Sequence, residues 1–191
     1  MTSEHPDVLY AIDAEDCLVE LSSSWQPFAE QNEGGISLNP GSVLGQSLWT
    51  FVRGESLQVL YRDVLTTVRR SGRPFEFDYR CDSPALRRHM HMRVEPLPDG
   101  IVRFQSRTVR IESRNQPLHV VAASTGHHHL KRCSICNRFG LPDRTWSDVL
   151  DAITVGQAMN QDRPLQIIWG ICDDCRGNLR TRLEQTAASA E

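Results

Sequence analysis

The sequence lacks long hydrophobic runs, although hydrophobic residues make up 39% of its 191 residues. Every apolar stretch is far shorter than the roughly 18 residues that a membrane-spanning helix needs. The N-terminal residues also lack the basic segment and the apolar segment that together mark a secretory signal. We therefore expect a globular protein of the cytoplasm that does not associate with membranes.

The sequence also lacks a strong excess of charge. It contains 21 Lys and Arg against 24 Asp and Glu, which gives a formal net charge of −3. A protein that binds nucleic acid through its phosphates usually carries a basic surface. Nucleic acid is therefore not the expected partner.

Motifs of common catalytic sites are missing as well. The chain has no Gly-x-Ser-x-Gly segment, no glycine-rich phosphate loop and no His-x-Glu segment of a zinc hydrolase. We therefore expect no enzymatic activity.

Cysteine is the residue type that carries the clearest pattern. Four of the six cysteines form two Cys-x2-Cys pairs, Cys133 with Cys136 and Cys172 with Cys175. Each pair can place two thiolate sulfurs about 2.3 Å from one zinc ion, and two pairs complete a tetrahedral shell. A closed shell leaves no position for water or substrate, so the pattern predicts a structural Zn²⁺ site. Disulfides are the alternative, but thiols in a chain without an export signal are normally reduced.

The two cysteine pairs are separated by a long segment. Between Cys136 and Cys172 lie 35 residues, whereas a plain zinc ribbon has about 15–20 between its pairs. The excess predicts an inserted helix from Thr145, because apolar residues recur there at helical spacing: Trp146, Val149, Leu150 and Ile153. A strand over 165–169 and a closing helix over 176–186 complete the predicted module.

Three segments in the middle of the chain alternate between apolar and polar residues, as half-buried strands do. They cover residues 75–81, 89–94 and 102–106. Two shorter strands are predicted within 8–21, and residues 54–71 place leucine, tyrosine and valine on one helix face. The alternation predicts an antiparallel sheet that buries one face.

This order of two strands, helices and three strands resembles the fold of PAS domains. An Asp-Ala turn at 13–14, Trp-x2-Phe-Ala at 25–29 and Arg-Cys-Asp-Ser-Pro at 80–84 are similar to one group of bacterial PAS proteins. Arg80 and Asp82, together with Arg87 and Arg88, are expected to form an exposed charged network or a partner surface. Single exposed ion pairs contribute only about 0–1 kcal/mol each.

The C-terminal part resembles the zinc-binding tail of many bacterial PAS sensors and receiver-domain proteins. The resemblance depends on the two cysteine pairs, an Asp-to-Trp segment at 143–146 and Gly-Ile-Cys at 170–172. One departure is Trp169, which stands where that group often has histidine.

The two resemblances imply an α+β fold. It consists of a PAS-like five-stranded antiparallel sheet with flanking helices, plus a small zinc-stapled α/β module. The PAS-like sensor or interaction domain is expected over 7–112, a linker over 113–129 and the four-cysteine zinc-binding module over 130–186.

A PAS sheet covered by helices can enclose a small-molecule ligand. The same apolar side chains can also simply fill the core, which is the more common role of aromatic and methionine residues on strands. The candidate pocket residues are Trp25, Phe28, Trp49, Tyr61, Phe77, Tyr79, Met90, Met92 and Phe104.

Neither haem nor flavin is expected in this pocket. Haem needs an axial ligand, usually histidine, but His89 and His91 alternate with two methionines and face outward if the methionines face inward. The flavin-binding light sensors of the PAS class need a reactive cysteine on a helix. Cys17 and Cys81 are expected in a turn and a strand instead.

These observations favour a cytoplasmic signalling or adaptor protein. Its PAS domain would sense a ligand or bind a protein partner, or a second copy in a homodimer, and its zinc module would present a docking surface. Two alternatives stay open: a transcription-associated protein that binds nucleic acid through the zinc module, and a redox sensor whose thiolates release zinc on oxidation.

Overall fold

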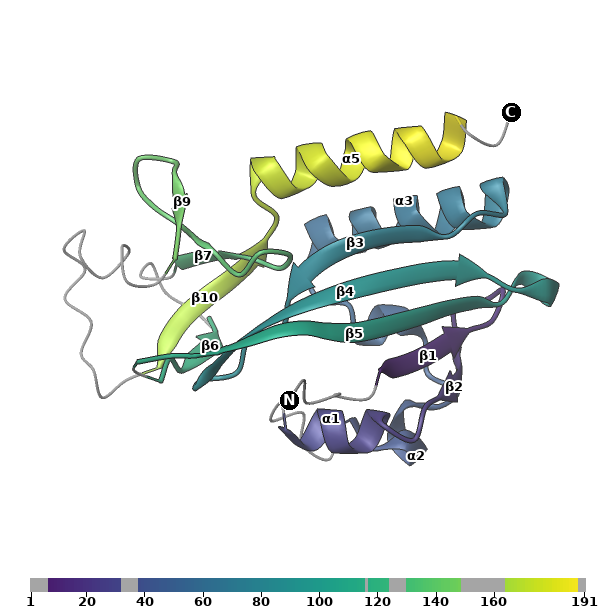
Figure 1. Ribbon diagram of the computed structural model, residues 1–191, viewed down its shortest axis with the longest axis horizontal. Coiled ribbons are helices and arrows are strands. Elements are labelled where there is room, and N and C mark those ends of the chain that lie inside the picture. The colour runs from purple at the N-terminus through teal and green to yellow at the C-terminus, as the bar shows by residue number, and fades with distance from the viewer. Residues whose placement is uncertain (1–6, 32–37, 116, 124–129, 149–163, 189–191) are drawn as a thin grey trace.

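The computed structural model contains two β-sheets with helices packed beside them (Figure 1). The structure describes residues 7–31, 38–115, 117–123, 130–148 and 164–188. The first part contains β1 (Val8–Ile12), β2 (Leu18–Leu21), α1 (Trp25–Gln31), α2 (Pro40–Val43), η2 (Leu48–Thr50), α3 (Glu55–Ser71), β3 (Phe75–Arg80), β4 (Leu86–Pro96), η3 (Pro98–Gly100) and β5 (Val102–Ser113). The second part contains β6 (Val120–Ala122), β7 (Leu130–Cys133), β8 (Phe139–Gly140), β9 (Trp146–Ser147), β10 (Leu165–Gly170) and α5 (Asp173–Ala188).

The first sheet has the strand order β2-β1-β5-β4-β3, and all of its neighbouring strands are antiparallel. Strand β4, the first part of β3 and the first half of β5 bury alternate residues on the side that faces α3, as the alternation predicts. This sheet, with its helices inserted between β2 and β3, confirms the predicted PAS-like α+β fold.

Helix α3 begins one residue after the predicted start at Gly54 and ends at Ser71, as predicted. Val64, Leu65 and Val68 are buried toward the sheet. Gly72 follows the last turn in the left-handed conformation, with φ of 64°, and its N–H bonds to the carbonyl of Val68. Glycine adopts this conformation without steric cost, so it closes the helix before β3.

The second sheet has the order β6-β10-β7-β8-β9, and β10 runs parallel to both of its neighbours. The segment expected to be a linker, 113–129, therefore contributes a strand, β6, to this sheet. The helix predicted to start at Thr145 is wrong at its first turn, because Trp146 and Ser147 form β9 and pair with β8. A two-residue pairing is too short to leave a recognisable alternation. The other residues of that predicted helix, 149–153, lie outside the described part.

Helix α5 returns from the second sheet to the first. It runs beside α3 and across β3 (Figure 1). Its first residue is Asp173 rather than the predicted Arg176. Leu179 and Leu183 are buried in the same hydrophobic cluster as the PAS-like sheet. Burial of one leucine contributes about 1.5–3 kcal/mol, so α5 is held on the sheet through a narrow apolar contact.

No helix within the described residues is both long enough and apolar enough to cross a lipid bilayer.

Phe104 lies at the centre of the aromatic core. Its ring stacks on Tyr10 at 4.6 Å and on Tyr61 at 6.1 Å between centroids. We expect Phe104→Ala to lower the free energy of unfolding by about 3–5 kcal/mol, because the cavity cannot close fully. Urea unfolding monitored by circular dichroism measures this loss. The control is Val109→Ala on the same strand, where the side chain is 60% exposed; it should change stability by less than about 0.5 kcal/mol. Equal losses of stability in the two variants would contradict the central position of Phe104 in the core.

Candidate metal centre and apolar pocket

The first cysteine pair lies on the tight hairpin between β7 and β8. The N–H of Cys133 bonds to the carbonyl of Arg138 at 2.9 Å, and the N–H of Asn137 bonds to the carbonyl of Cys133 at 2.9 Å. Asn137 has φ of 59°, a conformation that asparagine tolerates better than most residues. The turn therefore brings Cys133 and Cys136 to one side of the hairpin.

The second pair lies where β10 passes into α5. Cys172 directly precedes the helix, and Cys175 lies in its first turn. The N–H of Cys172 points to the sulfur of Cys133 at 3.4 Å, and the N–H of Cys175 points to the sulfur of Cys172 at 3.5 Å. Backbone N–H groups at a helix start stabilise thiolates, so this position suits an anionic ligand.

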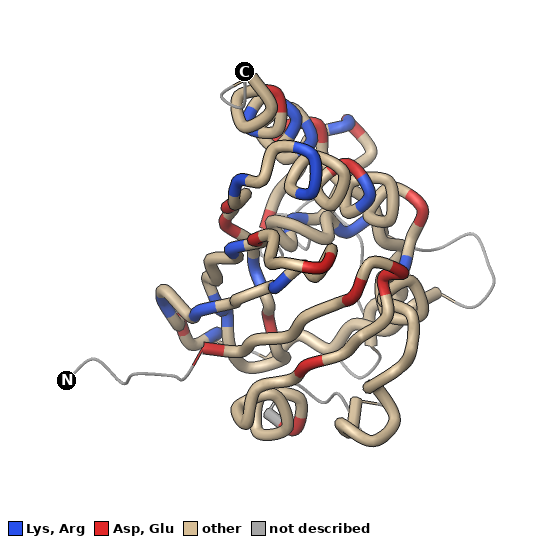
Figure 2. Tube along the Cα trace, turned by 90° about the vertical axis from the view of Figure 1, so that its right-hand side faces the viewer, with Lys and Arg blue, Asp and Glu red and all other residues tan. Residues whose placement is uncertain are grey.

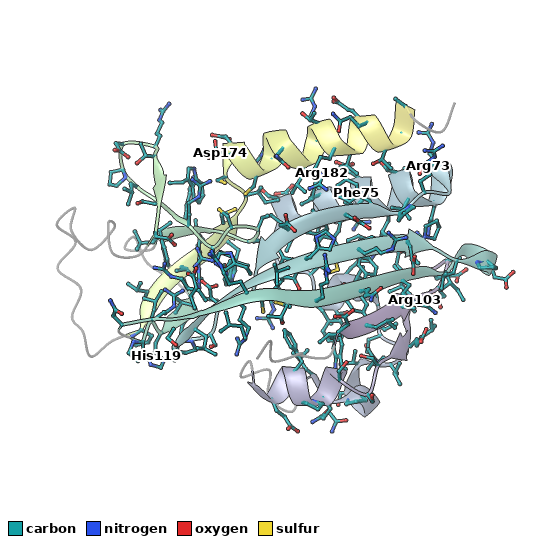
Figure 3. The ribbon with its side chains drawn as sticks, viewed as in Figure 1. Arg73, Phe75, Arg103, His119, Asp174 and Arg182 are labelled. Carbon is teal, nitrogen blue, oxygen red and sulfur yellow. The ribbon has the colours of Figure 1, made fainter. Side chains whose placement is uncertain are left out.

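The four sulfur atoms form one cluster. They lie within 4.8 Å of one another, and Cys133 and Cys172 are buried. The sulfurs of Cys136 and Cys172 are 3.8 Å apart, close to the edge of about 3.8 Å of a tetrahedron with Zn–S bonds of about 2.3 Å. Figure 3 shows the sulfur atoms beside the first turn of α5, near Asp174. The donor set and the spacing therefore fit a metal ion that prefers four thiolates.

Arg138 supplies the positive charge beside this cluster. Its Nε donates to the sulfur of Cys136 at 3.2 Å, and its Nη2 donates to Asp174 at 2.9 Å. Hydrogen bonds from Cys133, Cys175 and Arg138 hold the pKa of the Cys136 thiol far below its usual value. Burial raises the pKa of Cys172 to about 11. A bound cation would displace the remaining thiol protons, because thiolate is the ligand form.

The carboxylate of Asp82 joins the two sheets. Its side chain is only 2% exposed, and it accepts hydrogen bonds from Arg80, from Arg114 at 2.6 Å and from Arg132 at 3.5 Å. These arginines come from the end of β3, the residue after β5, and β7. The expectation of an exposed network at Arg80 and Asp82 is therefore wrong, because the hairpin of the second sheet covers them. Arg88 is buried as well.

Arg132 lies at the centre of this buried junction. Burial lowers its pKa to about 10, although Asp82 opposes the shift. Its guanidinium lies 5.3 Å from the ring centre of Phe139 and 5.5 Å from that of Trp169, distances typical of cation–π contacts. Arg132 therefore pairs with Asp82 and with rings of its own sheet.

The apolar pocket of the PAS-like sheet lies under α3 and α5. Three of the nine predicted residues line it: Tyr61, Phe77 and Phe104. Within the described residues it leaves no interior space for a water-sized molecule. The lining residues that the sequence did not identify are Leu60, Val64, Val94 and Leu179. Leu60 and Val64 could have been found from the helix periodicity, but Leu179 belongs to the distant C-terminal helix.

The other predicted pocket residues lie elsewhere in the domain. Trp25 donates to the carbonyl of Leu38 at 2.8 Å, and Trp49 donates to Asp16 at 3.0 Å. Tyr79 bonds to Ser106, which satisfies its hydroxyl. Phe28 is half-buried on α1, and Met90 and Met92 are buried on β4, outside the pocket lining.

The histidines of β4 face the opposite side of the sheet. His91 contacts Asp78 at 2.7 Å and Glu76 at 3.6 Å, and His89 lies 3.7 Å from Glu112. Their side chains therefore point away from the pocket, as the alternation with two buried methionines predicts.

In the view of Figure 2, basic and acidic positions are interspersed along the chain.

Comparisons with known proteins identify no family for this chain. No protein-family model matches it, and no curated protein matches it. Among solved structures, a domain of an HTR-like protein from Haloarcula marismortui is 16% identical, with a TM-score of 0.40; the match covers 55% of this chain and 99% of that domain. The PAS domain of the RpfR quorum-sensing receptor from Cronobacter turicensis, in complex with C12:0, is 17% identical, with a TM-score of 0.40 and coverage of 58% and 100%. The PAS-like description of this chain therefore depends on its own strand order.

We expect Asp82→Ala to lower the free energy of unfolding by about 3–5 kcal/mol, because it leaves the buried guanidinium groups of Arg114 and Arg132 without their anion, while Arg80 keeps Asp148 at 2.9 Å. Chemical unfolding of the full chain measures this loss. The matched control is Glu184→Ala, which breaks an ion pair whose two side chains are 80% and 63% exposed and should cost less than about 0.5 kcal/mol. A loss as small as that of the control would show that Asp82 does not join the sheets.

Proposed function

We propose that this chain is a non-enzymatic signalling or adaptor protein of the cytoplasm. Its PAS-like domain senses a small apolar molecule or binds a protein partner. A structural zinc ion at Cys133, Cys136, Cys172 and Cys175 stabilises the C-terminal module, which offers the docking surface. The observation that carries the proposal is the four-sulfur cluster, placed at the base of a helix that packs on the PAS-like sheet.

The shape of the site supports a structural rather than a catalytic metal. Four sulfur ligands fill a tetrahedral shell and leave no position for a substrate. Two of the cysteines are buried, and the second sheet is too small to build a large core of its own. Outside the large hydrophobic cluster that it shares with the PAS-like sheet, the second sheet has a small apolar core of its own. This core consists of Phe139 and Ile167 with partly buried neighbours.

Elemental analysis and an absorption spectrum of the purified full chain test the proposal. We expect one zinc per chain and no visible absorption band. Cys136→Ser and Cys172→Ser should each lower the zinc content well below one per chain, because three thiolates hold the ion less tightly. Cys17→Ser is the control, since Cys17 lies outside the cluster. Protein without zinc, in which the four thiols are reduced, would contradict the metal assignment; a visible band would indicate a chromophore in the PAS-like domain.

We further expect the chain to form a homodimer, which the resemblance to PAS domains implies. Sedimentation velocity across micromolar concentrations should then show a species of twice the chain mass of 21.7 kDa. A monomer throughout this range would contradict the dimer and leave the zinc assignment unaffected.

A further inference from the structure

Helix α5 covers the apolar pocket of the PAS-like sheet. Leu179 lines this pocket together with Tyr61 and Phe77, and Leu183 is buried one turn further along α5. Without α5, the side chains of α3 and β3 at this position would face solvent. The helix therefore closes the side of the pocket that the PAS-like domain leaves open.

The apolar contact alone is a weak attachment for this helix. Only Leu179 and Leu183 are buried among its 16 residues. Ordering a segment of this length costs conformational entropy, and an isolated helix of about this length is marginal in water. Gly177 in its second turn lowers the helix propensity further. The closed position of α5 therefore needs a second attachment.

The four-cysteine cluster provides that attachment at the first turn of α5. Cys172 and Cys175 belong to the start of the helix, whereas Cys133 and Cys136 belong to the β7–β8 hairpin. The hairpin is joined to β3 independently of any metal. The N–H of Arg80 bonds to the carbonyl of Ile135 at 2.7 Å, and the side chain of Asn137 donates to the carbonyl of Arg80 at 3.0 Å.

These attachments differ in what happens when the metal leaves. The hairpin keeps its backbone bonds to β3 and its ion pair with Asp82. The first turn of α5 keeps its chain connection to β10 and the exposed ion pair between Arg138 and Asp174. The rest of α5 keeps only the burial of Leu179 and Leu183. Loss of the metal should therefore free the helix before it disrupts the sheets.

We propose that α5 is a lid on the PAS-like pocket and that occupation of the four-cysteine site by zinc keeps this lid closed. The inference rests on the proposed zinc site and adds a regulatory role to it. With zinc bound, the pocket is closed and filled. When zinc leaves, α5 separates from α3 and β3, and the apolar pocket becomes accessible.

Hydrogen exchange of the full chain, followed by mass spectrometry of peptides, tests the lid. The zinc content of the sample is measured first, and the exchange is then compared before and after removal of zinc with a chelator. We expect the amides of α5 to exchange at least about ten-fold faster after removal, while those of β4 and β5 change by less than about two-fold, because local opening is separate from global unfolding.

A pair of variants on α5 separates the lid contact from the metal. Leu179→Ala should keep one zinc per chain and still speed the exchange of α5. It should also raise the fluorescence of 1-anilinonaphthalene-8-sulfonate, a dye that binds exposed apolar surface. Thr181→Ala on the exposed side of the same helix is the control and should change neither signal.

Each outcome supports or contradicts a distinct statement. A chain that binds no zinc contradicts the proposed metal site, and with it zinc control of the lid. A chain that binds zinc but keeps α5 protected after chelation contradicts the lid alone. Simultaneous loss of protection in α5, β4 and β5 also contradicts the lid, because zinc would then support the whole fold.

Discussion

The buried carboxylate of Asp82 is the contact on which the arrangement of the two sheets depends. It lies between guanidinium groups from three segments that are far apart in the sequence: Arg80, Arg114 and Arg132. These cations repel one another, so they can share a buried space only around an anion. Removal of one partner from such a group is costly, even where the group as a whole adds little net stability. Its role here is therefore to specify one orientation of the hairpin on β3.

This junction determines where the cysteines lie. Because Arg132 directly precedes Cys133, the bond to Asp82 sets the position of the first cysteine pair relative to the PAS-like sheet. The second pair lies at the end of β10, which is parallel to β7 and pairs with it up to Cys133. The chain leaving Cys175 is thereby directed along α3. Cys175 of the metal centre and Leu179 of the pocket thus lie about one turn apart on α5.

The sequence predicts most of the local structure and part of the candidate site. Alternation predicts the strands of the PAS-like sheet, and helical periodicity predicts α3, because one buried face dictates both patterns. The Cys-x2-Cys spacing identified all four residues of the sulfur cluster. Contacts between distant segments were not predictable in the same way. The charges of Arg80 and Asp82 favour an exposed position, and nothing in the order of residues shows that a hairpin 50 positions later covers the carboxylate of Asp82.

The residues that line the pocket were also only partly predictable from the sequence. Size and apolar character predict aromatic residues as pocket walls, yet Trp49 and Tyr79 bond to Asp16 and Ser106 and do not line the pocket. Leu179 was assigned to the metal module, although it completes the pocket lining. A helix with two buried leucines has too weak an amphipathic pattern to reveal its partner surface.

The proposed lid gives the zinc site and the apolar pocket a thermodynamic connection through α5. If bound zinc favours the closed helix, zinc weakens the binding of any apolar molecule that takes the place of Leu179. Because coupling between two sites is reciprocal, that molecule must weaken the binding of zinc by the same factor. The size of this coupling is limited by what α5 contributes when closed, which is the burial of its two leucines. A narrow contact is therefore an advantage for such a switch: a broad apolar face on α5 would hold the helix closed whether or not the metal is bound.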